Sequence, residues 1–206
     1  SGEGLALSGA GTVAANNISG NTKASMSESD VESSGDLTIN ADDETNVKSI
    51  VGNGVISLSG GNAAGAIGAG ADKISYTRST TAELLGNATN QNTINARNLN
   101  VKANSAQTIE SYAVGVGLAV SGLGSGSVNG AVSTEKNVAK TTATVANIKG
   151  RLSNIAVDAQ HSNNLKRFNL GAAASGGVYS GSLGFSVGVL NDNSETRAAF
   201  NNNNII

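Results

Sequence analysis

Apolar and polar residues alternate along three short segments of this chain. The segments are 37–41, 99–103 and 155–159, and each reads apolar-x-apolar-x-Ala, as in the Leu-Thr-Ile-Asn-Ala of the first. A period of two predicts a β-strand with one buried face. Helical spacing is not sustained anywhere and β-branched residues are frequent, so the chain is predicted to be all-β.

A second motif, Thr-x-Ala-x-apolar, occurs four times and indicates that the chain repeats. Its threonines are Thr22, Thr80, Thr141 and Thr196, at steps of 80−22 = 58, 141−80 = 61 and 196−141 = 55 residues. Repetition of this length indicates a supersecondary unit stacked along an axis. We expect one repeat-built domain over 1–206, an excerpt of a longer chain, with units at roughly 1–50, 51–112, 113–170 and a truncated 171–206.

Glycine-rich apolar runs lie upstream of each threonine, and their Ser-Gly pairs are predicted to keep the same phase. The pairs are Ser8-Gly9, Ser59-Gly60, Ser121-Gly122 and Ser180-Gly181. In the run Val114–Val120 one alternate set is Val and Leu, and the other is glycine and alanine. The small set suits close approach by a second sheet. We expect turns at 59–62 and 121–126, where glycine readily adopts positive φ.

The predicted fold is a β-solenoid, a right-handed parallel β-helix, in which each unit of about 58 residues makes two or three coils. The alternative is a stack of antiparallel β-hairpin repeats, in which Val114–Val120 folds back onto Ser127–Ser133. The absence of proline fits either form, because proline removes a hydrogen-bond donor from a sheet.

Composition narrows the classes of function. The net charge is −2 and no basic cluster exceeds Lys166-Arg167, so no nucleic-acid partner is expected. No stretch approaches the roughly 20 apolar residues of a membrane helix, so membrane insertion is not expected. Cysteine is absent, which is compatible with export of a large bacterial surface protein through an outer-membrane pore.

The order of these segments resembles the passenger regions of very large Gram-negative adhesins. A Gly/Ala/Val/Ser-rich run, an Asn/Thr segment, a Thr-x-Ala strand and an apolar-Thr-apolar-x-Ala strand follow one another over essentially the whole chain. The chain is most similar to repeats of filamentous-haemagglutinin-like and leukotoxin-type adhesins, exported as autotransporters or by two-partner secretion. The resemblance implies an extracellular β-solenoid at the outer-membrane surface, with a protein or glycan receptor on host cells or bacteria. It brings no catalytic residues.

Two segments carry residue types suited to calcium or acid–base chemistry. The segment 68–74, Gly-Ala-Gly-Ala-Asp-Lys-Ile, is similar to a nonapeptide calcium repeat. Ile67 replaces the first glycine and no tandem copy follows, so a strand-end turn is expected there. Asp42-Asp43-Glu44 is the densest acidic cluster. Its counterparts 104–106 and 160–162 vary in charge, which favours a solvated turn.

Individual His, Phe and Tyr side chains add little evidence for a functional site. His161 is the only histidine and has no cysteine to share a zinc ion with, so a surface imidazole is expected. Phe185 and Phe200 fall on apolar positions and are predicted to be core, whereas Tyr112 and Tyr179 are predicted to be exposed.

We expect no catalytic, cofactor-binding or metal-binding residues. The leading hypothesis is a structural and adhesive segment of a bacterial cell-surface adhesin, whose fragment associates end to end through open sheet edges. Two alternatives stay open. One is a carbohydrate-active β-helix enzyme using Asp42, Asp43 and Lys102, and the other is a membrane-acting leukotoxin segment whose glycine runs lie on a target membrane.

Overall fold

The computed structural model describes residues 4–206, and every regular element in that range is a β-strand. The all-β prediction is therefore confirmed. Six strands of 23 to 29 residues dominate: β1 (Leu5–Ser27), β3 (Asp36–Leu58), β4 (Ala63–Leu85), β5 (Asn92–Val120), β6 (Gly124–Ala146) and β8 (Leu152–Gly176). The shorter strands are β2 (Val31–Glu32), β7 (Ile148–Gly150), β9 (Tyr179–Asp192), β10 (Glu195–Asn201) and β11 (Asn204–Ile205).

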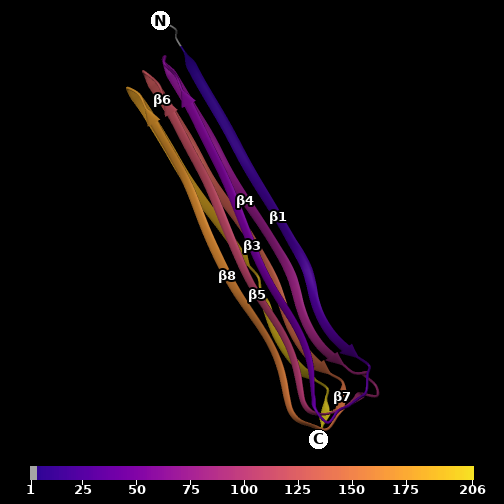
Figure 1. Ribbon diagram of the computed structural model, residues 1–206. Helices are drawn as coiled ribbons and strands as arrows, with labels where there is room; N and C mark the ends of the chain where they lie inside the picture. The colour runs from indigo at the N-terminus through magenta and orange to yellow at the C-terminus, as the bar shows by residue number, and fades with distance from the viewer. Residues whose placement is uncertain (1–3) are drawn as a thin grey trace.

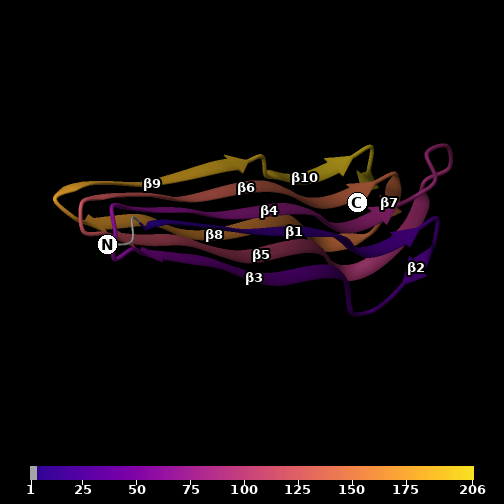
Figure 2. The same cartoon turned by 90° about the horizontal axis from the view of Figure 1, so that it is seen from above.

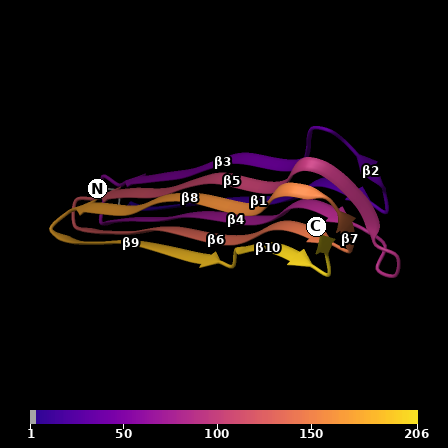
Figure 3. The same cartoon turned by 90° about the horizontal axis from the view of Figure 1, so that it is seen from below.

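Successive long strands alternate between two sheets, which lie face to face (Figures 2 and 3). The first sheet holds β1, β4, β6, β9 and β10, and the second holds the long strands β3, β5 and β8 together with the short strands β2, β7 and β11. Every ladder among the described residues is parallel. Parallel strands in two stacked sheets are consistent with a β-solenoid.

The antiparallel hairpin alternative is wrong. β5 pairs with β3 and β8, and β6 pairs with β4, β9 and β10, so Val114–Val120 and Ser127–Ser133 belong to different sheets. The glycine-rich segment between them turns the chain from one sheet into the other. It does not return the chain along the same sheet.

The register aligns the motifs that repeat in the sequence. Thr22 pairs with Thr80, Thr80 with Thr141 and Thr141 with Thr196, and Leu37, Leu99 and Ile155 likewise lie in one row. The Ser-Gly pairs do not all share a phase, which corrects that prediction. Ser59 and Ser121 occupy equivalent places after β3 and β5, whereas Ser8 pairs with Ala66 and Ser180 with Ser125, all within strands.

Each unit makes one very broad coil, not two or three. The strand-like segments that the sequence separates are joined into strands of 23 or more residues (Figure 1). At about 3.3 Å per residue, a strand of 23 residues is about 76 Å long. They join because alternation continues through the Asn/Thr-rich and glycine-rich stretches between the apolar runs. The predicted turns at 59–62 and 121–123 are confirmed, but no glycine in them has the expected positive φ, and 124–126 already belongs to β6.

The two ends of the coils differ. At one end, here called the apex, short arches at 59–62, 121–123 and 177–178 join the second sheet to the first. At the other end, the base, longer connections carry β2, β7 and β11. Glu28, Asn147 and Asn202 end the first-sheet strands there with positive φ of 48°, 59° and 50°.

The interior changes character along the strands. Near the base it is apolar, with Leu84, Leu99 and Val145 fully or almost fully buried. Near the apex most inward residues are Gly, Ala or Ser and none is an apolar residue larger than valine, because the sheets approach closely. A Cβ at Gly115 would collide with the carbonyl oxygen of Gly130 in the facing strand. The predicted close approach on the small face of Val114–Val120 is therefore confirmed.

Short polar side chains bridge the thin apex half. Thr12 Oγ1 donates to the Gly52 carbonyl at 3.0 Å, Asn53 Nδ2 to that of Ala10 at 2.7 Å, and Ser57 Oγ to that of Ala6 at 2.9 Å. Bonds from a side chain of one sheet to the backbone of the other require this separation. They satisfy polar groups that a dry interior would otherwise penalise.

Gly115→Ala should destabilise the protein, whereas Gly54→Ala in the neighbouring strand should not. The methyl group at 115 meets backbone that cannot move aside, which costs about 1–3 kcal/mol. At Gly54 a Cβ meets nothing within 4 Å, and the loss of chain entropy in the unfolded state favours alanine slightly. Urea unfolding followed by far-UV circular dichroism measures both, and equal midpoints would contradict the close approach.

Candidate functional site

Charged side chains gather in the interior midway along the strands. Asp43 in β3 and Arg78 in β4 form an ion pair across the two sheets, with 2.8 Å between Asp43 Oδ1 and Arg78 Nη2. The Asp43 side chain is only 5% exposed. The Thr45 hydroxyl donates to the same carboxylate at 3.3 Å.

A second group of charges lies nearer the apex. Asp72 accepts hydrogen bonds from the hydroxyls of Ser49 at 2.7 Å and Ser111 at 2.6 Å, both from the facing sheet. Glu135 lies 3.5 Å from Arg167, measured from Oε1 to Nε. Arg167 occupies space that a Cβ at Gly188 would fill.

Burial raises the pKa of the carboxyl of Glu135. Its side chain is 2% exposed, and this desolvation raises the pKa of the carboxyl above its usual range. The Arg167 guanidinium opposes that rise, and the nearby Asp72 carboxylate adds to it. Burial likewise raises the pKa of the Tyr76 phenol in the same interior.

These charges join the sheets and are closed to substrate. Each carboxylate is matched to a cation or hydroxyl of the facing strand, and the group lies between two continuous sheets. A general acid must reach its substrate within hydrogen-bond distance, and Glu135 faces inward. The arrangement is suited to fixing one sheet against the other.

The acidic cluster does not form the expected solvated turn. Asp42, Asp43 and Glu44 lie in the middle of β3, so their side chains alternate outward, inward and outward. The sequence showed the polar run but not Arg78, the cation 35 residues further on (78−43 = 35) that holds Asp43 inside.

The calcium-like segment is also not a turn. Residues 68–74 lie inside β4, where Asp72 points inward and its carboxylate is occupied by serine hydroxyls. Within the described range 4–206, no three His, Cys, Asp or Glu side chains are grouped to hold a metal ion.

The residues of the hypothetical enzyme do not converge. Asp42 and Lys102 lie on the outer face of the second sheet, and Asp43 lies in the interior. His161 is not a surface imidazole: its side chain faces inward from β8, half-buried, in the row of Asp43 and Ser105.

The predictions for the aromatic side chains are only partly correct. Phe185 points outward from β9 and is 45% exposed, so it is not core. Phe200 shares the inward row of Val145, yet it remains 45% exposed because no further strand of the described chain covers it. Tyr179 is exposed as expected, whereas Tyr112 is half-buried.

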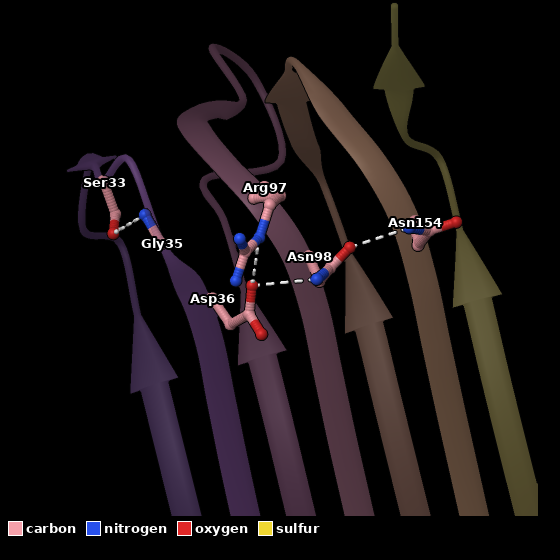
Figure 4. A network of polar contacts seen from close by, with 6 residues as sticks. All are labelled: Ser33, Gly35, Asp36, Arg97, Asn98 and Asn154. Atoms are coloured by element: carbon pink, nitrogen blue, oxygen red, sulfur yellow. Dashed lines mark hydrogen bonds and ion pairs between the residues drawn. The ribbon is translucent and has the colours of Figure 1, made fainter.

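At the base a polar ladder crosses the outer face of the second sheet (Figure 4). Asn98 Nδ2 donates to Asp36 Oδ1 at 2.8 Å, and Asn154 Nδ2 donates to Asn98 Oδ1 at 2.7 Å. Arg97 donates to the same Asp36 oxygen at 3.0 Å, and this bond holds the pKa of Asp36 below its usual value. Polar side chains at equivalent positions of one row thus bind the coils to one another.

Comparisons with known proteins identify no relative. No family model, no curated protein and no solved structure matches the chain. No helix with the length and apolar character to span a bilayer occurs in residues 4–206.

Arg78→Met should lower the free energy of unfolding by about 2–4 kcal/mol, because it leaves the Asp43 carboxylate buried without a cation. Lys23→Met is the matched control. It breaks the pair of Lys23 with Glu83, but that lysine is 55% exposed, so the expected loss is below about 1 kcal/mol. Denaturant unfolding at pH 7 compares the two. Equal losses would show that the interior pair is as solvated as the surface pair.

Glu135→Gln should change how stability depends on pH. A carboxyl whose pKa is raised on folding binds its proton more tightly when folded, so its contribution to stability is lost as the pH rises from about 4.5 through the native pKa. The free energy of unfolding of the parent protein minus that of the variant should therefore fall over this window, by at most about 1.4 kcal/mol per pH unit. A difference that rises with pH would mean that Arg167 dominates over burial.

Proposed function

We propose that this chain is a structural and adhesive segment of a large bacterial cell-surface adhesin, located outside the cell at the outer-membrane surface. In this proposal it is part of a right-handed β-solenoid whose coils are units of about 58 residues. Its partners are a protein or glycan receptor on host cells or other bacteria, and no nucleic acid.

The observation that carries the proposal is the in-register stacking of coils around an interior occupied by packing and paired charges. Thr22, Thr80, Thr141 and Thr196 lie in one row across four strands. The charges inside are matched to partners of the facing sheet, as Asp43 is to Arg78. Such a body offers large outer faces and a scaffold that can be extended by further coils.

The dimensions of a coil favour presentation of a surface over spacing. Each added coil lengthens the stack by only about 4.8 Å but adds two strands about 76 Å long. A stalk built this way needs many residues for each ångström of its length. The same residues build a broad face quickly, which suits attachment.

Both sheets have open edges to which further strands can bind. β1 and β3 pair on one side only, with β4 and β5, and β8 pairs only with β5. Unpaired edges of this length bind further strands. In the proposed function these edges receive further coils, and in a purified fragment they favour end-to-end association.

Antibodies raised against the purified chain test the proposed location and role. Intact cells of the bacterium that encodes it should be labelled on the outside without permeabilisation, because the segment is exported. Monovalent Fab fragments of these antibodies should reduce attachment to host cells several-fold, compared with Fab fragments against an unrelated surface protein. Labelling that needs permeabilised cells would overturn the proposed location, and unchanged attachment would overturn the adhesive role.

A further inference from the structure

The apex half of the molecule carries its large apolar side chains on the outside. On the second sheet they form a continuous field on the outer face of β3, β5 and β8. Between 36% and 67% of each side chain is exposed in Ile50, Ile56, Leu58, Val116, Leu118 and Phe168. Monomeric soluble proteins rarely leave a contiguous apolar surface of this kind uncovered.

The first sheet shows the same property on the opposite face. Its outward apolar side chains in the apex half include Leu7, Val13, Ile67, Leu183 and Val187, which are 47% to 79% exposed. The two-sheet body is here called the blade, and its apex half is thus apolar on both outer faces, while small residues such as Gly115 and Gly117 fill the space between them.

No charge interrupts this half. The runs 4–22, 49–71, 111–134 and 168–191 contain no Asp, Glu, Lys, Arg or His, and each runs through or up to the apex. Charged residues reappear at the boundary, on the outer face of the second sheet as the row of Lys48, Glu110 and Lys166. Tyr112 and Phe168 stand in the next outward row toward the apex.

The boundary lies at the same height on both faces. The hydrogen bonds from Asn16 to Ser49 and from Ser8 to Ile56 show which levels of the two sheets face each other. Lys73, in the row next to Asn16, therefore marks the edge of the apolar field on the first sheet. Lys48, next to Ser49, marks the edge on the second.

The height of the field matches a bilayer. Ile50–Leu58 spans 58−50+1 = 9 residues, which at about 3.3 Å per residue is about 30 Å. The hydrocarbon core of a typical bilayer is about 30 Å thick. Aromatic side chains and lysines at its edge are the residues that favour the membrane–water interface.

We propose that the apex half of the blade is a membrane-contacting element that takes the hydrocarbon of a lipid bilayer against both outer faces. The inner strands β4, β5 and β6 satisfy their backbone hydrogen bonds on both sides, as hydrocarbon requires. The open edges of β1, β3 and β8 receive further coils in the proposed function, on which this step rests. A groove of about 340 Å³ over Gly65 and Gly126, lined by Leu7, Ile67 and Val128, gives acyl chains a place to pack. The base half, with Lys102, Asp42 and other charges on its outer face, stays in water.

A second copy of the chain fits these observations less well. A face-to-face partner would cover one sheet and leave the other exposed, and it requires no common boundary height on the two faces. The lack of a helical apolar segment in the sequence argued against insertion, but that argument does not cover strands that are apolar on alternate positions.

Single cysteines test the proposal cleanly, because the chain contains none. Val116→Cys and Ile67→Cys place an environment-sensitive dye on opposite faces of the apex half, and Asn100→Cys and Thr81→Cys place it on the same strands in the base half. With phosphatidylcholine vesicles the dye at 116 and 67 should brighten several-fold. Acyl-chain-brominated phosphatidylcholine should then quench it, and the dye at 100 and 81 should not respond.

Flotation with the same vesicles supplies a second measurement. Val116→Lys and Ile67→Lys should each lower the vesicle-bound fraction more than tenfold, because a charge enters hydrocarbon at high cost. The controls Asn100→Lys and Thr81→Lys should float like the parent protein, with unchanged circular dichroism.

Three outcomes would overturn the proposal. The first is parent protein that stays folded and does not float. The second is a dye response at only one of positions 116 and 67, which would indicate a one-sided partner. The third is a response that needs no vesicles and grows with protein concentration, which would indicate a second copy. Should a lysine variant fail to fold, the dye measurements decide alone.

Discussion

The structure depends on parallel, in-register stacking, which places every side chain about 4.8 Å from its equivalents in the adjacent coils. Like charges at that distance would repel in a buried row. The interior avoids this by surrounding each charge with neutral residues: Glu135 lies between Ile74 and Leu190, and Asp43 lies next to Ser105. A charge that has no counter-ion in its own row must find one across the interior. For this reason the interior ion pairs connect the two sheets, whereas the pairs that run along a sheet lie on its outer face.

The same stacking governs the apex half. Where one coil brings the sheets close enough for Asn53 to reach the opposite backbone, the next coils carry smaller residues at that level. The row of Asn53 continues as Gly115 and Gly171, and the row of Val55 continues as Gly117 and Ala173. Apolar side chains larger than valine then have no room inside and occupy the outer positions. The apolar outer faces are therefore a consequence of the thin interior. In the proposed membrane contact, these same faces meet the hydrocarbon of the bilayer.

The sequence predicts well which residues of neighbouring coils pair, but it predicts poorly which side chains point into the interior. The rows of Thr22 and Leu37 could be predicted because repeated motifs at a nearly constant period specify which residues pair. In Val114–Val120 the glycine and alanine set predicts the close approach of the second sheet, although the usual rule that large residues point inward would assign the two faces the other way round. The length of the strands could not be predicted either, because polar residues inside a strand have the same composition as a turn. Asp43 shows why: only the facing Arg78, which no local pattern indicates, makes that position inward and buried.

The breadth of the coil also determines what the addition of coils achieves. Each one adds an outward row at every level, so a polar ladder such as Asp36–Asn98–Asn154 grows at the base while the apolar field grows at the apex. A contact that is weak for one coil is multiplied by the number of coils without any change in local geometry, which is how repeated sites gain avidity. The two halves of the blade are thereby tied to the same repeat number. A longer array holds its apolar half more firmly against whatever covers it, and it presents a correspondingly wider polar half to the solvent.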